Sequence, residues 1–259
     1  MNATSNQARD CLGATDVIIL AGGLGTRIKG VLGATPKVLA PIDGRPFLSY
    51  LLHWLAGYGA KRIIMGLGHL AGEVETYLAR NSFPGLDIQC LIEPKPLGTG
   101  GAVAFLCETP RSDPVMIING DSFVDADLCA FKEAHRRSGA EASILCTTVP
   151  EAGRYGSVEL DERGQIHAFR EKDPAGGPGL INAGVYLLSR AMIDRIRASG
   201  AFSLERDILQ QTGPDALYGH AGDFTFIDIG TPEDLQRAAS VLVSRSRNSL
   251  QRISRESGH

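Results

Sequence analysis

Short apolar runs alternate with helical patterns through the first 120 residues of the sequence. The runs at 17–20, 62–68, 86–93 and 114–120 have the length and composition of buried strands. Between 47 and 58, and again in the later gaps, apolar residues recur at helical spacing. This rhythm predicts right-handed β-α-β units. It therefore predicts a three-layer, Rossmann-like α/β fold, with a mixed, mostly parallel sheet covered by helices on both faces.

The second half of the chain has a different character. Apolar runs at 142–149, 156–160 and 165–172 are expected to form strands. The segment 161–164 between the last two contains Asp and Gly, which predicts a hairpin turn. A further strand is expected at 181–189. These strands add a small antiparallel portion to the predicted sheet.

A strand at 224–230 is followed by the signals of a final helix. Thr231 is suited to cap that helix and Pro232 to occupy its first position, and the helix is expected to end near residue 243. The segments outside this region are polar. The predicted organisation is a flexible N-terminus, one domain and a polar C-terminal tail, at residues 1–14, 15–243 and 244–259.

Composition narrows the functional classes. The chain has 259 residues and a formal net charge of −3, which argues against a general basic surface for nucleic acid. Its five cysteines are scattered, so their spacing predicts neither a zinc site nor a disulfide framework. No apolar run approaches the roughly 18–20 residues of a membrane span. We expect a cytoplasmic protein that binds neither membranes nor nucleic acid.

Three glycines directly follow the first predicted strand, and two separate cations follow the glycines. Gly22, Gly23 and Gly25 allow a ligand to approach the main chain closely. Arg27 offers a planar fork for phosphate oxygens, and Lys37 offers a compact positive charge. In an acidic chain, this local pairing of glycines with cations predicts a polyphosphate site.

The spacing of these residues excludes two common phosphate-binding loops. A dinucleotide-binding G-x-G-x-x-G loop would need a small residue where Ile28 stands. A P-loop would need Lys and Ser or Thr after Gly30, where Val31 and Leu32 follow instead. A Rossmann oxidoreductase is therefore disfavoured.

The segment "LAGGLGTR…TPKVLAPI" resembles the signature of the sugar-1-phosphate nucleotidylyltransferases, and the resemblance runs from residue 16 to about 240. It implies that the glycine loop holds a nucleoside triphosphate. Arg27 would bind the triphosphate and Lys37 would bridge phosphates during the reaction, which makes them the two catalytic residues. The implied nucleotide-binding residues are Leu20, Ala21, Gly22, Gly23, Gly25, Thr26, Arg27, Leu97, Gly98, Thr99 and Asn119.

The second nucleotide motif lies between 93 and 102. It consists of a strand end, a stiff Pro-x-Pro segment and a glycine-rich helix start, whose free N–H groups suit a base or a phosphate. In the related family, the Leu-Gly-Thr-Gly-Gly type of segment lies on the base.

Two aspartates follow apolar strands that lie far apart in the sequence. Asp121 follows the run at 114–120, and Asp228 lies within 224–230. Ligand-binding groups gather at the carboxyl ends of strands in open α/β sheets. The family resemblance implies that these two carboxylates bind the catalytic Mg²⁺, which commonly takes one or two protein carboxylates.

A third set of residues resembles the sugar pocket of the family. Glu171 and Asn182 would hydrogen-bond sugar hydroxyls, and Lys172 would hold the sugar 1-phosphate. Tyr155 and Gly156 belong to the same implied pocket. The small antiparallel portion is therefore expected to bind the sugar.

The implied reaction is nucleotidyl transfer, in which an oxygen of a sugar 1-phosphate attacks the α-phosphorus of a nucleoside triphosphate and pyrophosphate leaves. The motifs are closest to the D-glycero-α-D-manno-heptose 1-phosphate guanylyltransferase branch. This favours GTP and the heptose phosphate as substrates, and a product used for capsule, lipopolysaccharide or S-layer glycans.

Several alternatives stay open at this point. Within the family, they are a mannose-1-phosphate guanylyltransferase and a cytidylyl- or uridylyltransferase. A non-catalytic nucleotide-sugar-binding regulator would belong to another class, although such a protein could have lost the charged set that this chain retains, namely Arg27, Lys37, Asp121 and Asp228. A homo-oligomer is possible in any of these cases.

Overall fold

The computed structural model describes residues 10–23, 25–108, 111–170 and 176–242. One half of its main sheet is parallel and contains four strands in the spatial order β6-β1-β4-β5. Their bounds are β1 (Val17–Ala21), β4 (Arg62–Leu67), β5 (Asp87–Ile92) and β6 (Val115–Asn119). All four were expected from their apolar composition, and each is found within one or two residues of its predicted bounds.

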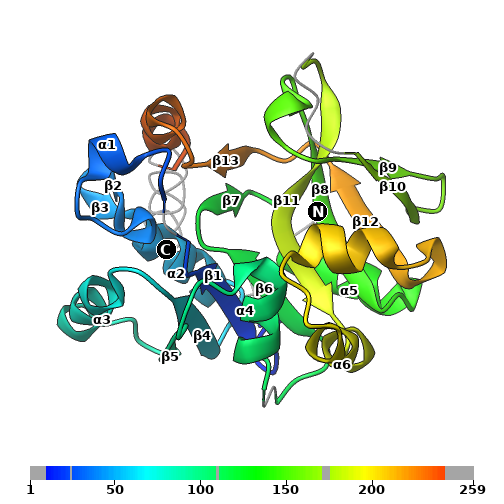
Figure 1. Ribbon diagram of the computed structural model, residues 1–259, viewed down its shortest axis with the longest axis horizontal. Helices are drawn as coiled ribbons and strands as arrows, with labels where there is room; N and C mark the ends of the chain where they lie inside the picture. The colour runs from blue at the N-terminus through cyan, green and yellow to red at the C-terminus, as the bar shows by residue number, and fades with distance from the viewer. Residues whose placement is uncertain (1–9, 24, 109–110, 171–175, 243–259) are drawn as a thin grey trace, which may run out of the picture.

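The other half of the sheet is mostly antiparallel. The long strand β11 pairs antiparallel with β6, β8 and β9, β10 pairs with β9, and β12 runs parallel to β8. The bounds are β8 (Ala142–Val149), β9 (Ser157–Leu160), β10 (Ile166–Arg170), β11 (Gly179–Leu188) and β12 (Leu217–Gly222). The predicted mixed, mostly parallel sheet is confirmed, and the antiparallel portion lies beside β6 (Figure 1).

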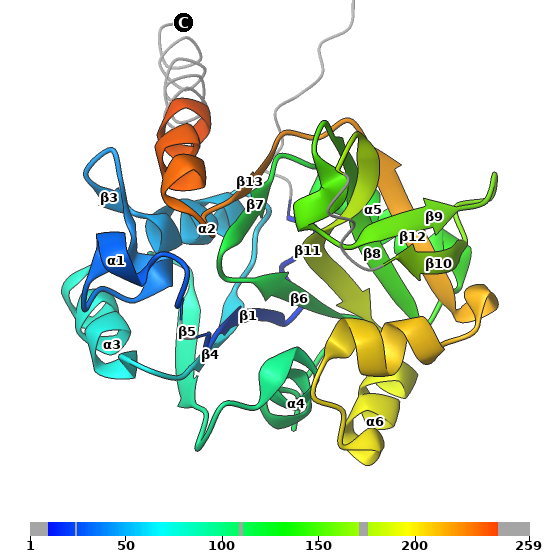
Figure 2. The ribbon, with the colours of Figure 1, turned by 45° about the horizontal axis from the view of Figure 1, so that its top comes forward.

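Helices cover both faces of the sheet. The period-2 alternation of β1 sends Ile19 into one apolar core and Ile18 into the other. The first core includes α2 (Phe47–Ala56), α3 (Ala71–Arg80), α5 (Leu128–Ser138) and the helix at 232–242. The second contains α4 (Gly98–Leu106), α6 (Arg190–Ser199) and the π-helical turn η3 (Leu204–Ile208). Figure 2 shows α4 and α6 together below the sheet. The sheet is therefore the middle one of three layers.

Short elements connect these layers. Among the described residues, two small antiparallel pairs lie outside the main sheet: β2 (Pro41–Ile42) with β3 (Arg45–Pro46), and β7 (Ser122–Val124) with β13 (Phe226–Asp228). The remaining short elements are α1 (Lys29–Leu32), η1 (Lys37–Leu39), η2 (Ala152–Arg154), η4 (Leu209–Gln211) and η5 (Pro214–Ala216). None of the helices within the described ranges has both the length and the apolar character needed to cross a bilayer.

The predicted start of the final helix agrees with its geometry. The hydroxyl of Thr231 accepts a hydrogen bond from the backbone N–H of Asp234 at 3.3 Å and donates one to the Asp234 carboxylate at 2.8 Å. Arg154, on η2, forms an ion pair with the same carboxylate. Although burial acts in the opposite direction, the hydrogen bonds from Arg154 and Thr231 hold the pKa of Asp234 below its ordinary value.

The expectation about the cysteines is wrong in one respect. Cys11 and Cys129 form a disulfide with an S–S distance of 2.07 Å, which joins the segment before β1 to the first turn of α5. Leu12, next to this bond, is fully buried and its N–H donates to the carbonyl of Tyr58. Residues 10–14, predicted to be part of a flexible end, therefore pack on the domain. The cysteine spacing could not reveal the pair because 118 residues separate the two in sequence.

Candidate active site

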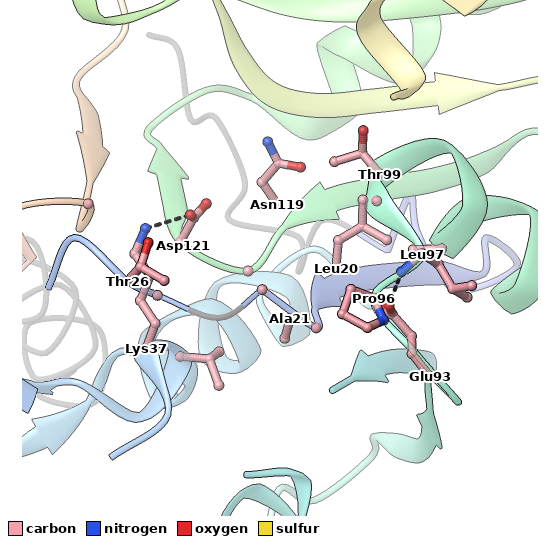
Figure 3. Close-up of a pocket in the computed structure, with 18 of the residues that line it drawn as sticks. Leu20, Ala21, Thr26, Lys37, Glu93, Pro96, Leu97, Thr99, Asn119 and Asp121 are labelled. Carbon is pink, nitrogen blue, oxygen red and sulfur yellow. Dashed lines mark hydrogen bonds and ion pairs between the residues drawn. The ribbon is translucent and has the colours of Figure 1, made fainter. Parts of the chain in front are cut away.

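A cavity of about 410 Å³ opens at the carboxyl ends of β1 and β6 (Figure 3). Its position agrees with the rule that open α/β sheets bind ligands at this edge. The cavity is lined by every residue that the sequence predicts to bind nucleotide, namely Leu20, Ala21, Gly22, Gly23, Gly25, Thr26, Arg27, Leu97, Gly98, Thr99 and Asn119. The two predicted nucleotide motifs, which lie far apart in sequence, therefore line the same cavity.

The three glycines after β1 differ in what a side chain at each position would meet. A Cβ on Gly22 would lie 2.2 Å from Oε1 of Glu93, so that carboxylate can pack there only against bare backbone. Gly25 has a φ of +56°, in the left-handed region that glycine occupies most easily. A Cβ on Gly23 would meet nothing within 4 Å. Glycine is therefore required by the fold itself at Gly22 and Gly25, and of the three only Gly23 leaves open space.

The start of α4 is held from two directions. The Leu97 N–H donates to Oε2 of Glu93 at 3.1 Å, and the Gly100 N–H donates to the carbonyl of Phe202 at 2.9 Å. A Cβ on Gly98 would lie 2.2 Å from that same carbonyl oxygen. Burial raises the pKa of Glu93, and the hydrogen bond from Leu97 opposes this rise. Gly98 therefore allows α4 to approach the segment that follows α6.

The two predicted metal-binding aspartates lie together. Strand β7 pairs with β13 so that Asp228 stands opposite Ser122, and the Ile229 N–H donates to the Asp121 carbonyl at 3.0 Å. The Lys37 ammonium lies 2.6 Å from Oδ2 of Asp121 and 3.7 Å from Oδ1 of Asp228. Three charged residues from distant parts of the chain therefore meet at one end of the cavity.

The electrostatics of this group fit a divalent cation. Burial and the neighbouring Asp121 raise the pKa of Asp228, while Lys37 and Arg27 act in the opposite direction. Oδ1 of Asp228 is buried and accepts no hydrogen bond from any described residue. A buried carboxylate oxygen that accepts no hydrogen bond and, among the described residues, has only the Lys37 ammonium at 3.7 Å, beside a second, more exposed carboxylate, is a donor set that Mg²⁺ accepts, with water and phosphate oxygens completing its shell. The residues present therefore fit the predicted metal.

The predicted sugar-binding residues are only partly placed. Tyr155 packs edge-on against Phe226 with ring centroids 5.5 Å apart, two residues before Asp228. Gly156 is exposed in the connection from η2 to β9. Asn182 lies on β11, where its Nδ2 donates to the Tyr186 hydroxyl at 2.8 Å. The remaining two predictions, Glu171 and Lys172, lie outside the described residues.

Sequence reasoning did not single out four residues of this region. Glu93 and Phe202 line the cavity, and Phe202 is 57% exposed, which is unusual for a large aromatic side chain. Glu93 stands in the recognised second motif, so its charge was a usable signal. Glu205 and Tyr186 lie behind the wall and hydrogen-bond to predicted site residues. Their sequence context carries no such signal, because only packing brings them there.

Comparison with known proteins identifies the family. The family model described as "Nucleotidyl transferase" matches residues 16–245. The chain belongs to the nucleotidyl transferase family. It is 36% identical over 228 residues to a D-glycero-alpha-D-manno-heptose 1-phosphate guanylyltransferase from Aneurinibacillus thermoaerophilus, a match that covers 88% of this chain and 98% of that protein.

A second relative and a solved structure extend the comparison within the nucleotidyl transferase family. A mannose-1-phosphate guanylyltransferase from Mycobacterium tuberculosis is 35% identical over 231 residues, which make up 88% of this chain but only 64% of that protein's length. The crystal structure of HddC from Yersinia pseudotuberculosis superposes with a TM-score of 0.79 at 35% identity, covering 87% of this chain and 98% of HddC. HddC has also been solved in complex with GMP-PN, with a TM-score of 0.78. The predicted α/β fold is thereby confirmed.

Proposed function

We propose that this protein transfers a guanylyl group from GTP to D-glycero-α-D-manno-heptose 1-phosphate and releases pyrophosphate. The observation that carries the proposal is the cavity itself, which the predicted nucleotide motifs line together with Lys37 and Asp121, and Asp228 forms an ion pair with the same Lys37. An uncharged cavity would not suit a reaction between two polyanions. The guanylyl choice rests on three relatives at 34–36% identity, which are named guanylyltransferases.

The chemistry asks the protein for position and charge. An oxygen of the sugar 1-phosphate attacks the α-phosphorus in line, and the bond to the leaving pyrophosphate breaks. The attacking oxygen is already anionic, so no general base is needed. Arg27 and Lys37 line the cavity, where they would bind phosphate oxygens and offset the charge that builds up as the two anions meet.

The proposed metal would be held by Asp121 and Asp228. When bound there, Mg²⁺ supplies positive charge to the phosphate oxygens. In the structure Lys37 forms ion pairs with both aspartates. Its ammonium therefore interacts directly with the proposed metal-binding pair. A bound phosphate would compete with the two aspartates for this ammonium.

The acceptor sugar separates the first choice from the second. Relatives at 36% and 34% identity are named for the heptose phosphate, and one at 35% is named for mannose 1-phosphate. Both acceptors have the manno configuration and differ only beyond C5. Mannose 1-phosphate with GTP is therefore the second candidate, because the same ring contacts would accept it.

A substrate panel tests the proposal. The purified protein with Mg²⁺ is offered GTP, CTP, UTP, dTTP or ATP together with heptose, mannose or glucose 1-phosphate, and pyrophosphate release is measured. We expect the largest kcat/KM with GTP and the heptose phosphate. A larger value with mannose 1-phosphate would support the second candidate. Absence of pyrophosphate with every pair, alongside tight nucleotide-sugar binding, would support a non-catalytic regulator instead.

A further inference from the structure

Two predicted substrate-binding residues from separate motifs are tied to one pair of side chains behind the cavity wall. Asn182 Nδ2 donates to the Tyr186 hydroxyl at 2.8 Å, and that hydroxyl donates to Oε1 of Glu205 at 2.8 Å. The other carboxylate oxygen of Glu205 accepts from the Thr99 hydroxyl at 3.0 Å.

The Tyr186 hydroxyl both donates and accepts in this network. A tyrosine hydroxyl has one proton to donate and two lone pairs to accept with, and here it donates to Glu205 and accepts from Asn182. The side chain is completely buried, and burial raises its pKa well above the ordinary value, so the proton stays on the oxygen. Buried and fully satisfied polar networks fix side chains in one arrangement.

A bulge in β11 brings these groups together. The pairing of β11 with β8 shifts register between Asn182 and Tyr186, where Gly184 has a φ of +75°. The Gly184 N–H donates to Oδ1 of Asn182 at 2.9 Å, and a Cβ on Gly184 would lie 2.7 Å from Nδ2 of Asn119. Bulges beside active sites re-aim side chains in this way. The glycine thus leaves room for the Asn119 amide beside the bulge.

Glu205 itself does not line the cavity. It lies on η3, in the layer of helices below the sheet, and its carboxylate accepts a hydrogen bond from Thr99, in the first turn of α4. The backbone of the preceding residue is held as well, because the Leu204 N–H donates to the Thr99 hydroxyl at 2.8 Å. Any effect of Glu205 on substrates must therefore act through Thr99 and Tyr186.

We propose that Tyr186 and Glu205 are positioning residues that hold the nucleotide side of the site, through Thr99, in register with the sugar side, through Asn182. This inference rests on the proposed function. Displacing reacting groups by about 1 Å can cost roughly 100-fold in rate. A hydrogen-bonded link between the two sides is therefore a direct way to control the rate.

The first test compares two variants that each lose one buried hydroxyl. Tyr186→Phe removes the centre of the network, and Tyr58→Phe removes a hydroxyl that donates to the Ala126 carbonyl at 3.0 Å, away from the cavity. We expect Tyr186→Phe to lower kcat by roughly tenfold or more, with a smaller change in the KM of GTP. Tyr58→Phe is expected to keep kcat within about twofold of the native value. Equal kcat values for the two variants at equal folded fraction would overturn the inference.

The second test is a double-mutant cycle, which measures the coupling between Thr99 and Asn182. A merely structural role of Tyr186 would produce no such coupling. The single variants Thr99→Val and Asn182→Ala and their combination are assayed in the native chain and in Tyr186→Phe. In the native chain we expect the combined loss of kcat/KM to differ from the product of the single losses by at least about threefold. In Tyr186→Phe the losses should multiply. Multiplicative losses in the native chain would refute the link.

Two controls keep these outcomes separable. If Tyr186→Phe fails to fold, Glu205→Gln replaces it, because glutamine keeps the shape and one acceptor oxygen but cannot accept from both sides as a carboxylate does. The native protein is assayed in the same series. If it releases no pyrophosphate with any substrate pair, the proposed function fails and this inference fails with it. If the native protein is active and the variants match their controls, only the inference fails.

Discussion

The two halves of the sheet bring functional side chains to the site in different ways. In the parallel half, β1 and β6 end at the same edge, so the residues that follow them meet there whatever their separation in sequence. In the antiparallel half, Asn182 comes from within the long strand β11, and a bulge and a buried tyrosine set its orientation. Topology alone therefore places the first set of residues, whereas the second depends on packing.

This difference explains the electrostatic division of the site. The described cations and carboxylates that meet at the cavity end are Lys37, Asp121 and Asp228, and all lie on or near connections that leave strands. The contacts behind the antiparallel half are hydrogen bonds in which one carboxylate, Glu205, accepts from the hydroxyls of Tyr186, Thr99 and its neighbour Ser203. Charge at an open edge suits phosphates, and a buried polar network suits fixed geometry.

The largest effect is expected at the carboxyl edge of the parallel half. Asp121→Asn removes one carboxylate from the proposed metal pair while keeping the shape of the side chain, and Asp121 is 41% exposed, so the fold should survive. We expect kcat to fall by roughly 100-fold or more, as a metal contribution of several kcal/mol implies. Pyrophosphate release at saturating Mg²⁺ measures this, with circular dichroism as the control for folding. Native kcat in this variant would contradict the metal assignment.

The second effect separates activity from stability at the same edge. Asp228→Asn should also lose most of its turnover. Because the folded-state pKa of Asp228 is raised, its contribution to stability is present below the unfolded-state pKa and is lost as pH rises through the folded-state pKa. Asparagine imitates the protonated form.

Without metal, Asp228→Asn should therefore be more stable than the native protein at pH 7.5, by about 1 kcal/mol. The advantage should disappear below the ordinary aspartate pKa of 3.8. Urea unfolding in EDTA across this pH range measures the difference. Mg²⁺ should raise the unfolding midpoint of the native protein only. A variant that is less stable at pH 7.5 would contradict the cause assigned to the pKa shift.

The third effect tests the contact between the two halves. Gly98→Ala would drive a Cβ to 2.2 Å from the Phe202 carbonyl and would strain a φ of +71°. We expect a loss of about 2 kcal/mol or more in unfolding free energy, and a smaller, roughly tenfold rise in the KM of GTP. Gly200→Ala is the matched control, because its φ is +67° but its Cβ would meet nothing within 4 Å. Its cost should be only about 1 kcal/mol. Equal costs would show that the contact contributes nothing.

The smallest effect on turnover is expected at the disulfide. Neither Cys11 nor Cys129 lines the cavity, so Cys129→Ser should keep kcat within about twofold of the native value. Its unfolding free energy should fall by about 2–4 kcal/mol, because the bond closes a long loop. Urea unfolding with and without reductant measures this, and the variant itself should not respond to reductant. A fall in turnover that matches the fall in stability would mean that the site extends to this face.

Much of the parallel half was predictable from the sequence, because buried strands have a distinct apolar composition and their connections carry charge. Helices α5 and α6 were missed, although Asp127 and Ser189 cap their starts and Gly139 and Gly200 end them in left-handed conformations. Their polar faces hid the apolar spacing. Strand β12 has a glycine-rich sequence and is defined by its pairing with β8.

The candidate site shows the same limit. The cavity brings together all the residues that were predicted to bind nucleotide, while the roles assigned to them stay predictions. Glu205 could not be found from the sequence, because its neighbours Thr99 and Tyr186 lie 106 and 19 residues away. The disulfide was missed for the same reason. Local patterns predict elements and strand ends, whereas contacts between layers depend on the completed packing.

The pairing of β7 with β13 has a consequence for protein synthesis. Asp121 is made more than 100 residues before Asp228, which ends the last strand of the described chain. Domains generally acquire structure as units while the chain emerges from the ribosome. A nascent chain that has not yet released β13 would carry the glycine loop and one carboxylate, but not the complete proposed metal-binding pair. The enzyme would therefore be unable to consume GTP until its fold is nearly complete.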